Sequence, residues 1–376
     1  MKNEKNKRIL INNTEFSREN VLIIAELGTS HRADPVKAEE LIEAAAEAGA
    51  GCIKFQIVYA REILHANTGE VELPGGKIRL FDRFKELEVA PSFFAEMKEK
   101  VEKKGLIFLC TPFGLQSARE LRELGPKCVK IASPELNYSA LIREIASYNL
   151  PTLLSTGVSK LGDIEEALSI MDENIGGRPP VCLLHCVTSY PAPERDYNLR
   201  VLKSLASVFG VPMGVSDHSL DPCLVPALAT AMEAAVIEKH FCLSRSDSGL
   251  DDPIALPPVE FARMVQAVRR AEKEGSEATI DAMCREHGED LVESVLGDGI
   301  KRLAPSEKAN YTRTNRSIHA LRDINEGEII ERDMIACLRT EKILTPGLFP
   351  SWEEQIIGLA AKRAIPAGEG ICFGDI

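Results

Sequence analysis

The chain alternates short apolar runs with longer amphipathic segments, and this alternation is its main feature. The apolar runs have the length of buried strands and span 21–27, 51–56, 106–111, 128–132, 152–156, 181–186, 211–216 and 235–240. Helix-like segments follow them near 35–48, 92–104, 115–124, 138–148, 161–173, 197–208, 222–233 and 258–274. Strands that are apolar on both faces and alternate with helices indicate a parallel sheet. Eight such units predict an α/β fold, a closed (β/α)8 TIM barrel.

An open, doubly wound sheet is the alternative fold built from the same elements. The first strand of such a sheet usually leads into a Gly-x-Gly-x-x-Gly turn, whereas the segment ELGTSH (26–31) has a single glycine. The barrel is therefore favoured. Two of its connections, 57–91 and 241–257, are long. Long loops at the catalytic rim of a barrel generally shape a substrate site.

Four regions follow from the change of pattern along the chain. We predict an N-terminal extension over 1–20, the barrel over 21–275, a charged helical linker over 276–311 and a small β-rich domain over 312–376. Within the small domain, DINEGEII (323–330) is echoed by AIPAGEGI (364–371). Each segment places Gly-Glu between β-forming residues, which predicts a tight turn used twice.

Charge and cysteine content limit the partners and the compartment. The 376 residues carry a formal net charge of -12, which argues against nucleic acid as a partner because no basic face offsets it. Ten scattered cysteines without a Cys-x-x-Cys pair are typical of reduced thiols in a cytoplasmic protein. The charged N-terminus is not a signal peptide, and no apolar run has transmembrane length. We expect a cytoplasmic protein that binds neither nucleic acid nor membrane.

Two histidines stand at the ends of neighbouring predicted strands. His218 follows the run 211–216, and His240 ends the run 235–240. The carboxyl ends of barrel strands meet at one mouth, where such barrels carry out their chemistry, so the two imidazoles are expected side by side. Two neutral nitrogen ligands suit a divalent metal and leave further positions open. The alternative is that each histidine is a hydrogen-bonded polar residue at a strand end.

Charged or hydroxyl-bearing side chains stand at the same end of every predicted strand. Ammonium and hydroxyl groups suited to a phosphate come from Lys54, Thr111, Lys130, Ser133, Ser155 and Ser216. Carboxylates that could orient a polyol or move a proton come from Glu26, Glu135 and Asp251. A lysine paired with a glutamate is an equally good explanation for either lysine alone. Together, these groups predict a metal-assisted reaction between a phosphorylated small molecule and a sugar.

Nine segments make the chain similar to a known family. They are IAELGTSH (24–31), IKFQ (53–56), CTPF (110–113), VKIASPE (129–135), LSTG (154–157), LLHCVTSYPAP (183–193), GVSDHS (214–219), IEKHF (237–241) and RSIHALRDINEGE (316–328). Over nearly its whole length the chain resembles the nonulosonic (sialic) acid synthases, with a C-terminal antifreeze-like (SAF, β-clip) domain. Members of that family are transferases that condense phosphoenolpyruvate with an N-acetylated aldose.

The resemblance implies a role for each matched position. The metal, usually Mn²⁺ with Mg²⁺ or Co²⁺ as alternatives, would be bound by His218 and His240. Phosphoenolpyruvate would be bound by Lys54, Thr111, Lys130, Ser133, Ser155 and Ser216. The sugar acceptor or the transferred proton would be contacted by Glu26, Gln56, Glu135, Tyr190 and Asp251, with Glu135 steering the attacking water. Because the family forms a domain-swapped homodimer, Arg316 would reach from the partner subunit's small domain into the site.

Departures from the family pattern concern the acceptor. The usual Gly-x-Asn-His-x-Gly is here Gly28-Thr-Ser-His31-Arg-Ala33, Asp252 stands where many relatives have histidine, and Thr188 stands where some have asparagine. We expect all three departures at the acceptor site. An N-acetylmannosamine-like acceptor is the first expectation, and a diacetamido-dideoxyhexose, as in pseudaminic or legionaminic acid synthases, is the alternative.

Two more distant alternatives remain open. A sugar-phosphate aldolase of the same barrel type would need a second basic cluster, for which the sequence offers no clear candidate. A catalytically inactive carbohydrate- or ice-binding protein would need no chemistry at the strand ends, yet every strand end keeps a reactive residue.

Overall fold

The computed structural model describes residues 7–73, 76–247 and 249–376 of the chain. Residues 1–6 of the predicted extension, 74–75 of the first long connection and 248 of the second lie outside the described residues. No helix within the described ranges has both the length and the apolar character needed to cross a lipid bilayer.

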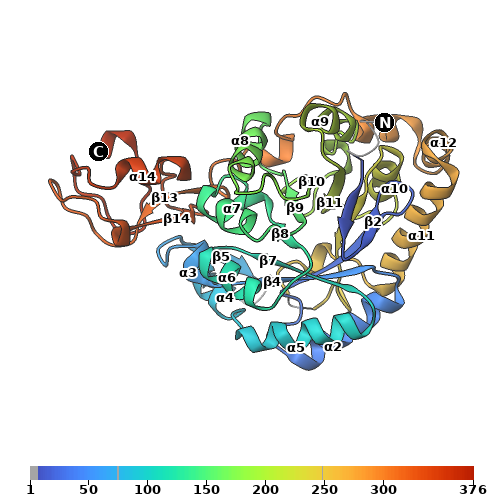
Figure 1. Cartoon of the computed structure of the whole chain (residues 1–376), viewed down its shortest axis with the longest axis horizontal. Helices are drawn as coiled ribbons and strands as arrows, with labels where there is room; N and C mark the ends of the chain where they lie inside the picture. Colours follow the sequence, from blue (N-terminus) through green and yellow to red (C-terminus); the bar gives the residue numbers. More distant parts are fainter. Residues whose placement is uncertain (1–6, 74–75, 248) are drawn as a thin grey trace.

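A parallel barrel forms the larger part of the molecule (Figure 1). Its strands are β3 (Leu22–Gly28), β4 (Cys52–Ile57), β7 (Ile107–Pro112), β8 (Val129–Ile131), β9 (Thr152–Ser155), β10 (Val181–Cys186), β11 (Met213–Asp217) and β12 (Val236–His240). The hydrogen-bonded order is β7-β4-β3-β12-β11-β10-β9-β8, and the two outer strands β7 and β8 contact each other. The eight strands therefore form a nearly closed barrel, which confirms the predicted fold.

Helices cover the outside of this barrel (Figure 1). They are α2 (Pro35–Glu47), α5 (Pro91–Lys103), α6 (Leu115–Glu123), α7 (Ser139–Ala146), α8 (Leu161–Asp172), α9 (Val201–Phe209), α10 (Leu224–Ala231) and α11 (Pro258–Glu274). Alternate strand residues such as Phe55 and Leu183 pack outward against helix residues such as Phe261. The strands are apolar on both faces because the opposite face fills the barrel interior, where Ile24 and Leu184 pack together.

The N-terminal extension is an integral part of the barrel. Strands β1 (Ile9–Ile11) and β2 (Thr14–Phe16) pair as an antiparallel hairpin. Ile9, Ile11 and Phe16 pack against the interior side chains near the amino ends of the barrel strands. The hairpin thus closes the end of the barrel opposite the strand ends that carry the candidate site.

The predicted linker is also largely barrel structure, so its predicted boundaries need correction. Helices α12 (Ser276–His287) and α13 (Glu289–Leu296) are joined to the main core through Met283, Val292 and Val295. Although the segment is rich in charge, the apolar faces of α12 and α13 are buried, and the two helices pack against α10 and α11. The connection between the two domains is therefore limited to residues 297–315.

The first long connection is structured and lies beside the small domain. It contains α3 (Ala60–Ile63), β5 (Glu70–Leu73), β6 (Gly76–Arg79) and α4 (Leu80–Lys85). Val58, Ile63, Leu64, Leu80 and Phe113 form a separate apolar cluster beneath it. In the second connection, η3 (Asp252–Ile254) is one short 3-10 turn.

The small domain projects from one side of the barrel (Figure 1). It contains the antiparallel pair β13 (Arg316–Ala320) and β14 (Ile335–Arg339), and the short helix α14 (Glu353–Ile356). The two echoed segments form turns around Gly327 (φ 79°) and Gly368 (φ 94°), and they pair with each other through Ile324 and Ile365. The rings of Trp352 and Phe373 meet edge to face, 4.9 Å apart.

Candidate active site

A cavity of about 70 Å³ lies at the carboxyl ends of the barrel strands. Predicted site residues supply most of its lining, namely Glu26, Lys54, Gln56, Lys130, Ser133, Ser155, Tyr190, Ser216, His218, His240 and Asp251. The cavity is therefore assembled from seven or more segments that are distant in sequence, as expected for a barrel mouth.

Glu238 holds the two predicted lysines together. Its carboxylate accepts from Lys130 Nζ at 2.9 Å on both oxygens and lies 3.0 Å from Lys54 Nζ. Lys54 Nζ also lies 3.1 Å from Glu26 Oε2. These side chains are buried, so water screens their charges little. Two ammonium groups are thereby fixed side by side at the edge of the cavity.

The charge of each carboxyl group depends on its neighbours. Burial alone would raise the pKa of Glu238, but the ammonium groups of Lys130 and Lys54 bring this pKa below its ordinary value. Burial raises the pKa of Glu26 to about 7, against the opposing effect of Lys54. Glu238 is therefore the permanent anion of the cluster, while Glu26 takes up or releases a proton near neutral pH.

Hydroxyl groups complete the predicted phosphate site. Ser216 Oγ donates to Glu238 at 3.1 Å, and Ser133 Oγ accepts from the Gly157 backbone N–H at 2.9 Å. Ser155 Oγ is buried and has no partner among the described residues. Thr111 contacts Lys54 Nζ at 3.5 Å from behind and does not line the cavity. The unpartnered Ser155 hydroxyl suits a ligand oxygen, because a buried polar group without a partner is costly.

The two predicted metal ligands lie beside each other, as the sequence indicated. The ring centroids of His218 and His240 are 5.4 Å apart, and Tyr190 stacks on His218 at 4.3 Å. His218 Nδ1 lies 2.9 Å from the carbonyl oxygen of Val187, so this nitrogen carries the proton and Nε2 keeps its lone pair. Burial lowers the pKa of His240 well below its ordinary value, which keeps its ring neutral. A neutral imidazole oriented by a backbone carbonyl is the form that binds metal.

A third group of side chains faces the predicted acceptor side. Gln56 Nε2 donates to Glu26 Oε1 at 2.5 Å, and Asp251 Oδ2 lies 3.7 Å from His240 Nδ1. Burial raises the pKa of Asp251 to about 6. Two carboxyl groups with pKa values near neutrality can donate or accept hydrogen bonds and protons, which suits a polyol.

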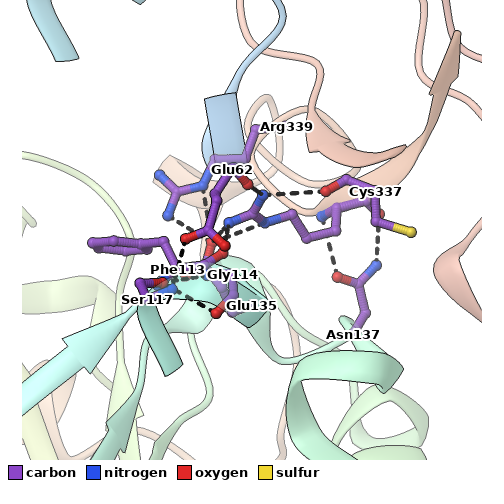
Figure 2. Close-up of polar contacts among 9 residues, drawn as sticks. Glu62, Phe113, Gly114, Ser117, Glu135, Asn137, Cys337 and Arg339 are labelled. Carbon is purple, nitrogen blue, oxygen red and sulfur yellow. Dashed lines mark hydrogen bonds and ion pairs between the residues drawn. The ribbon is translucent and has the colours of Figure 1, made fainter. Parts of the chain in front are cut away.

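Glu135 and Arg316 are not among the residues that line the cavity, and their predicted roles stay predictions. Glu135 Oε1 accepts from Arg316 at 3.0 and 2.9 Å and from Arg339 at 3.1 and 2.7 Å (Figure 2). Arg316 also donates to the backbone carbonyls of Glu62, Phe113 and Cys337. These contacts join the small domain to the barrel of the same chain. One oxygen of Glu135, Oε1, thus accepts from both guanidinium groups, whereas its buried Oε2 has no partner among the described residues.

The departures from the family pattern occupy different places. Thr188 lines the cavity, in agreement with the prediction. Asp252 instead accepts from Ser30 Oγ at 2.5 Å and from the Gly249 N–H at 2.6 Å, so it fastens two loops together. His31 is buried against Phe93, with ring centroids 4.7 Å apart. Of the three departures, only Thr188 contacts the space that a ligand would enter.

Glu238 is the central residue that sequence reasoning missed as part of the site. Glu238 lies two positions before His240, and strand residues two positions apart point to the same face. Glu238 and His240 therefore both face the cavity, whereas Lys239 points away and donates to Asp217 at 2.6 Å. The alternation of β12 was the signal that could have identified it. Cys186 also lines the cavity, with its Sγ 3.8 Å from His218 Nδ1.

Comparisons with known proteins cover both domains. Residues 41–279 match the NeuB family, and residues 315–376 match the SAF domain. N,N'-diacetyllegionaminic acid synthase of Campylobacter jejuni is 33% identical over 91% of this chain and 96% of its own length.

Two solved structures are similar over most of the chain. Spore coat polysaccharide biosynthesis protein SpsE from Bacillus subtilis has a TM-score of 0.82 and 32% identity, covering 98% of this chain and 99% of that one. N-acetylneuraminic acid synthetase from Leptospira borgpetersenii has a TM-score of 0.65 and 32% identity, covering 81% of this chain and 95% of that one.

Proposed function

The chain belongs to the NeuB family, and from this membership we propose that it condenses phosphoenolpyruvate with an N-acetylated aldose. The products are a nine-carbon nonulosonic acid and inorganic phosphate. The methylene carbon of phosphoenolpyruvate forms a bond to the aldehyde carbon, whose oxygen takes up a proton. Formation of this bond leaves an oxocarbenium ion at C2, to which water adds with loss of a proton. The C2–O bond to phosphate then breaks, which releases inorganic phosphate and leaves a ketone at C2.

One observation carries the proposal: two buried ammonium groups and two imidazoles border the same cavity. Lys54 and Lys130 are held at the cavity edge by Glu238, and His218 and His240 line the same cavity. A phosphate dianion beside the lysines gains charge-assisted hydrogen bonds in a site that excludes water. Ser155, whose hydroxyl has no partner, supplies a further donor for it.

The acceptor sugar occupies the side of Glu26, Gln56 and Asp251. These groups alternate donors and acceptors, which suits the hydroxyls of an open-chain aldose. With a pKa of about 7, Glu26 is our candidate to hold the proton that the aldehyde oxygen receives. Holding both reactants in one cavity supplies part of the rate by orientation alone.

The residues present fit a divalent ion. His218 and His240 would hold it, with Mn²⁺ as the first choice and Mg²⁺ or Co²⁺ as alternatives, and it would supply Lewis-acid polarisation of the aldehyde oxygen. Tyr190 stacks on one of these rings and fixes its orientation. Two protein ligands leave open positions for substrate oxygens, as catalytic metal sites require.

Experiment can distinguish between two candidate acceptors. N-acetylmannosamine is the first candidate, because an N-acetylneuraminic acid synthetase is among the similar structures. A diacetamido-dideoxyhexose is the second, because a legionaminic acid synthase is 33% identical to the chain. Thr188 is the cavity residue to which we assign the choice between them, since a family position that varies here lies in contact with the ligand space.

The test measures phosphate release from phosphoenolpyruvate with Mn²⁺ and each acceptor, with mass spectrometry of the product. His218→Ala and His240→Ala should abolish metal-dependent release, whereas His287→Ala, which lies on α12 away from the cavity, should retain it. Near-normal turnover of the purified double variant would refute the site. If the unmodified protein released no phosphate with any 2-acetamido or diacetamido hexose, a binding protein without activity would be favoured instead.

We also propose a homodimer in which the small domains are exchanged. The contacts of Arg316 and Arg339 with Glu135 can form in the same way between two subunits, because exchange of a domain reproduces the contacts made within one chain. Light scattering of the purified protein should give twice the mass of one chain, and a monomeric mass would exclude the exchange.

A further inference from the structure

A second and larger cavity of about 900 Å³ lies outside the barrel. Its walls come from the start of α8, the segment around η2 (Glu194–Asp196) and the segment 297–308, which passes over them. The volume is within the range of about 300–1,000 Å³ that is usual for small-molecule sites. None of the residues proposed for the condensation lines it.

The charges around this groove favour an anion. The cations are Lys160, Arg195, Lys301, Arg302 and Lys308, and the anions are Asp196, Asp298 and Glu307. The side chains of Arg195 and Lys308 are exposed and have no hydrogen bond or ion pair with the part of the chain that the structure describes. The net positive charge is unusual in a protein with an overall charge of -12.

The carboxylates of the groove have other partners and form no ion pair with Arg195 or Lys308. Asp298 pairs with Arg302, and Asp196 accepts the Ser306 N–H at 3.0 Å. Glu307 accepts backbone N–H groups of Val158 at 2.8 Å and Thr188 at 2.7 Å. The segment 297–308 is thereby fastened to the barrel, so the groove is formed before any ligand arrives, which lowers the cost of binding.

A buried histidine in the wall lacks one partner. His185 is 5% exposed, and its Nε2 lies 2.6 Å from the carbonyl oxygen of Tyr197. Because a carbonyl only accepts, Nε2 carries the proton, and Nδ1 is left as an acceptor. Nδ1 is buried and has no partner among the described residues. Burial and the charge of Lys301 lower the pKa of His185 to about 3, which keeps the ring neutral.

We propose that this groove binds a phosphorylated small molecule that also carries hydroxyl groups. The phosphate lies against the cationic rim of Arg195 and Lys308, and one hydroxyl donates to Nδ1 of His185. Leu161 and Leu303 provide apolar surface for the carbon skeleton. Two independent observations support the two parts of the ligand. The unpaired side chains of Arg195 and Lys308 support its phosphate, and the unpartnered Nδ1 of His185 supports its hydroxyl.

The test is isothermal titration calorimetry of the full chain with glucose 6-phosphate, a probe that has both groups. Arg195→Ala combined with Lys308→Ala should weaken binding by about tenfold or more, which corresponds to about 1.4 kcal/mol. Both side chains are exposed, so the double variant is expected to fold. Lys98→Ala with Lys103→Ala, which removes two cations from α5, should leave binding unchanged and controls for net charge.

Two further titrations distinguish binding in this groove from binding at the barrel mouth and test the role of the ligand hydroxyl. Lys130→Met should leave the affinity for glucose 6-phosphate unchanged, because Lys130 borders only the other cavity. Methyl phosphate, which lacks carbon-bound hydroxyls, should bind about tenfold more weakly. The proposal is overturned if glucose 6-phosphate does not bind at about 10 mM, or if Lys130→Met removes binding that the groove variant retains.

Discussion

Two buried clusters of this protein share one arrangement, a carboxylate between two cations, yet they differ in surroundings. At the barrel mouth, Glu238 is held between Lys54 and Lys130. Between the domains, Glu135 is held between Arg316 and Arg339 (Figure 2). The charged groups of both clusters come from barrel or small-domain strands, or from the turn Ser133–Glu135 that follows β8.

The difference lies in what else each cluster touches. The lysine cluster borders a cavity, and ammonium groups on flexible stems can turn from Glu238 to a ligand phosphate. All five N–H groups of Arg316 have acceptors, three of them through backbone carbonyls, so none is free for a ligand. Similar charges are thus accessible to a ligand where they border a cavity and serve domain attachment where protein encloses them.

Removal of one cation from the lysine cluster should have the largest effect. Lys130→Met leaves Glu238 paired with Lys54 but takes one charge from the proposed phosphate site. Phosphate release should fall on the order of 10³-fold, or about 4 kcal/mol of transition-state stabilisation. Steady-state kinetics with phosphoenolpyruvate measures this, with the exposed Lys103→Met as the control. A loss below about threefold would mean that the lysines serve only the ion cluster.

Removal of the anion from the arginine cluster should act on stability. Glu135→Gln leaves two buried guanidinium groups without a counter-ion, which should cost about 3 kcal/mol in the free energy of unfolding. Urea denaturation measures the change, and Glu99→Gln, which removes an exposed carboxylate, is the matched control. If Glu135→Gln were as stable as the unmodified protein, the contact between domains would not contribute to folding.

The pH dependence of stability sharpens the comparison further. The pKa of Glu26 is raised from 4.5 to about 7 in the folded state, so the folded protein keeps a proton that the unfolded chain loses above pH 4.5. The protonated Glu26 carboxyl therefore contributes fully to the free energy of unfolding below about pH 4.5. This contribution, about 2–3 kcal/mol, is lost as the pH rises to about 7. Glu26→Gln should remove this part of the dependence when denaturation midpoints at pH 5 and pH 8 are compared. Equal slopes in both proteins would contradict the raised pKa.

Exchange of one guanidinium for an ammonium should have the smallest effect. Arg339→Lys keeps the charge beside Glu135 but loses the two-pronged hydrogen bond, which should cost about 1 kcal/mol of stability. Arg332→Lys, in an exposed ion pair of the same domain, should cost less than half of that. Equal effects at the two positions would mean that burial of the cluster contributes nothing beyond a surface pair.

The barrel and the lysine cluster could be predicted from the sequence because their signals are local. Strands such as Val181–Cys186 were identified to the residue, since a strand buried on both faces is continuously apolar. Lys54, Lys130, His218 and His240 followed from their positions at strand ends, because barrel geometry brings all such ends together.

The arginine cluster could not be predicted in the same way, because it depends on how one domain lies against another. Glu135 and Arg316 are 181 residues apart, and nothing near either residue indicates the other. The helices at 276–296 were interpreted as a linker for a similar reason. Their charged surface is local, whereas the packing of Val292 and Val295 on the barrel is a tertiary contact.

The position of Trp352 gives the two domains separate optical signals. The chain contains one tryptophan, and it lies in the small domain against Phe373. Intrinsic emission excited near the red edge of aromatic absorption therefore reports on that domain alone, while ellipticity in the far ultraviolet is dominated by the helices of the barrel. Denaturation curves followed by both signals will coincide if the domains melt as one cooperative unit and will separate if they melt in turn.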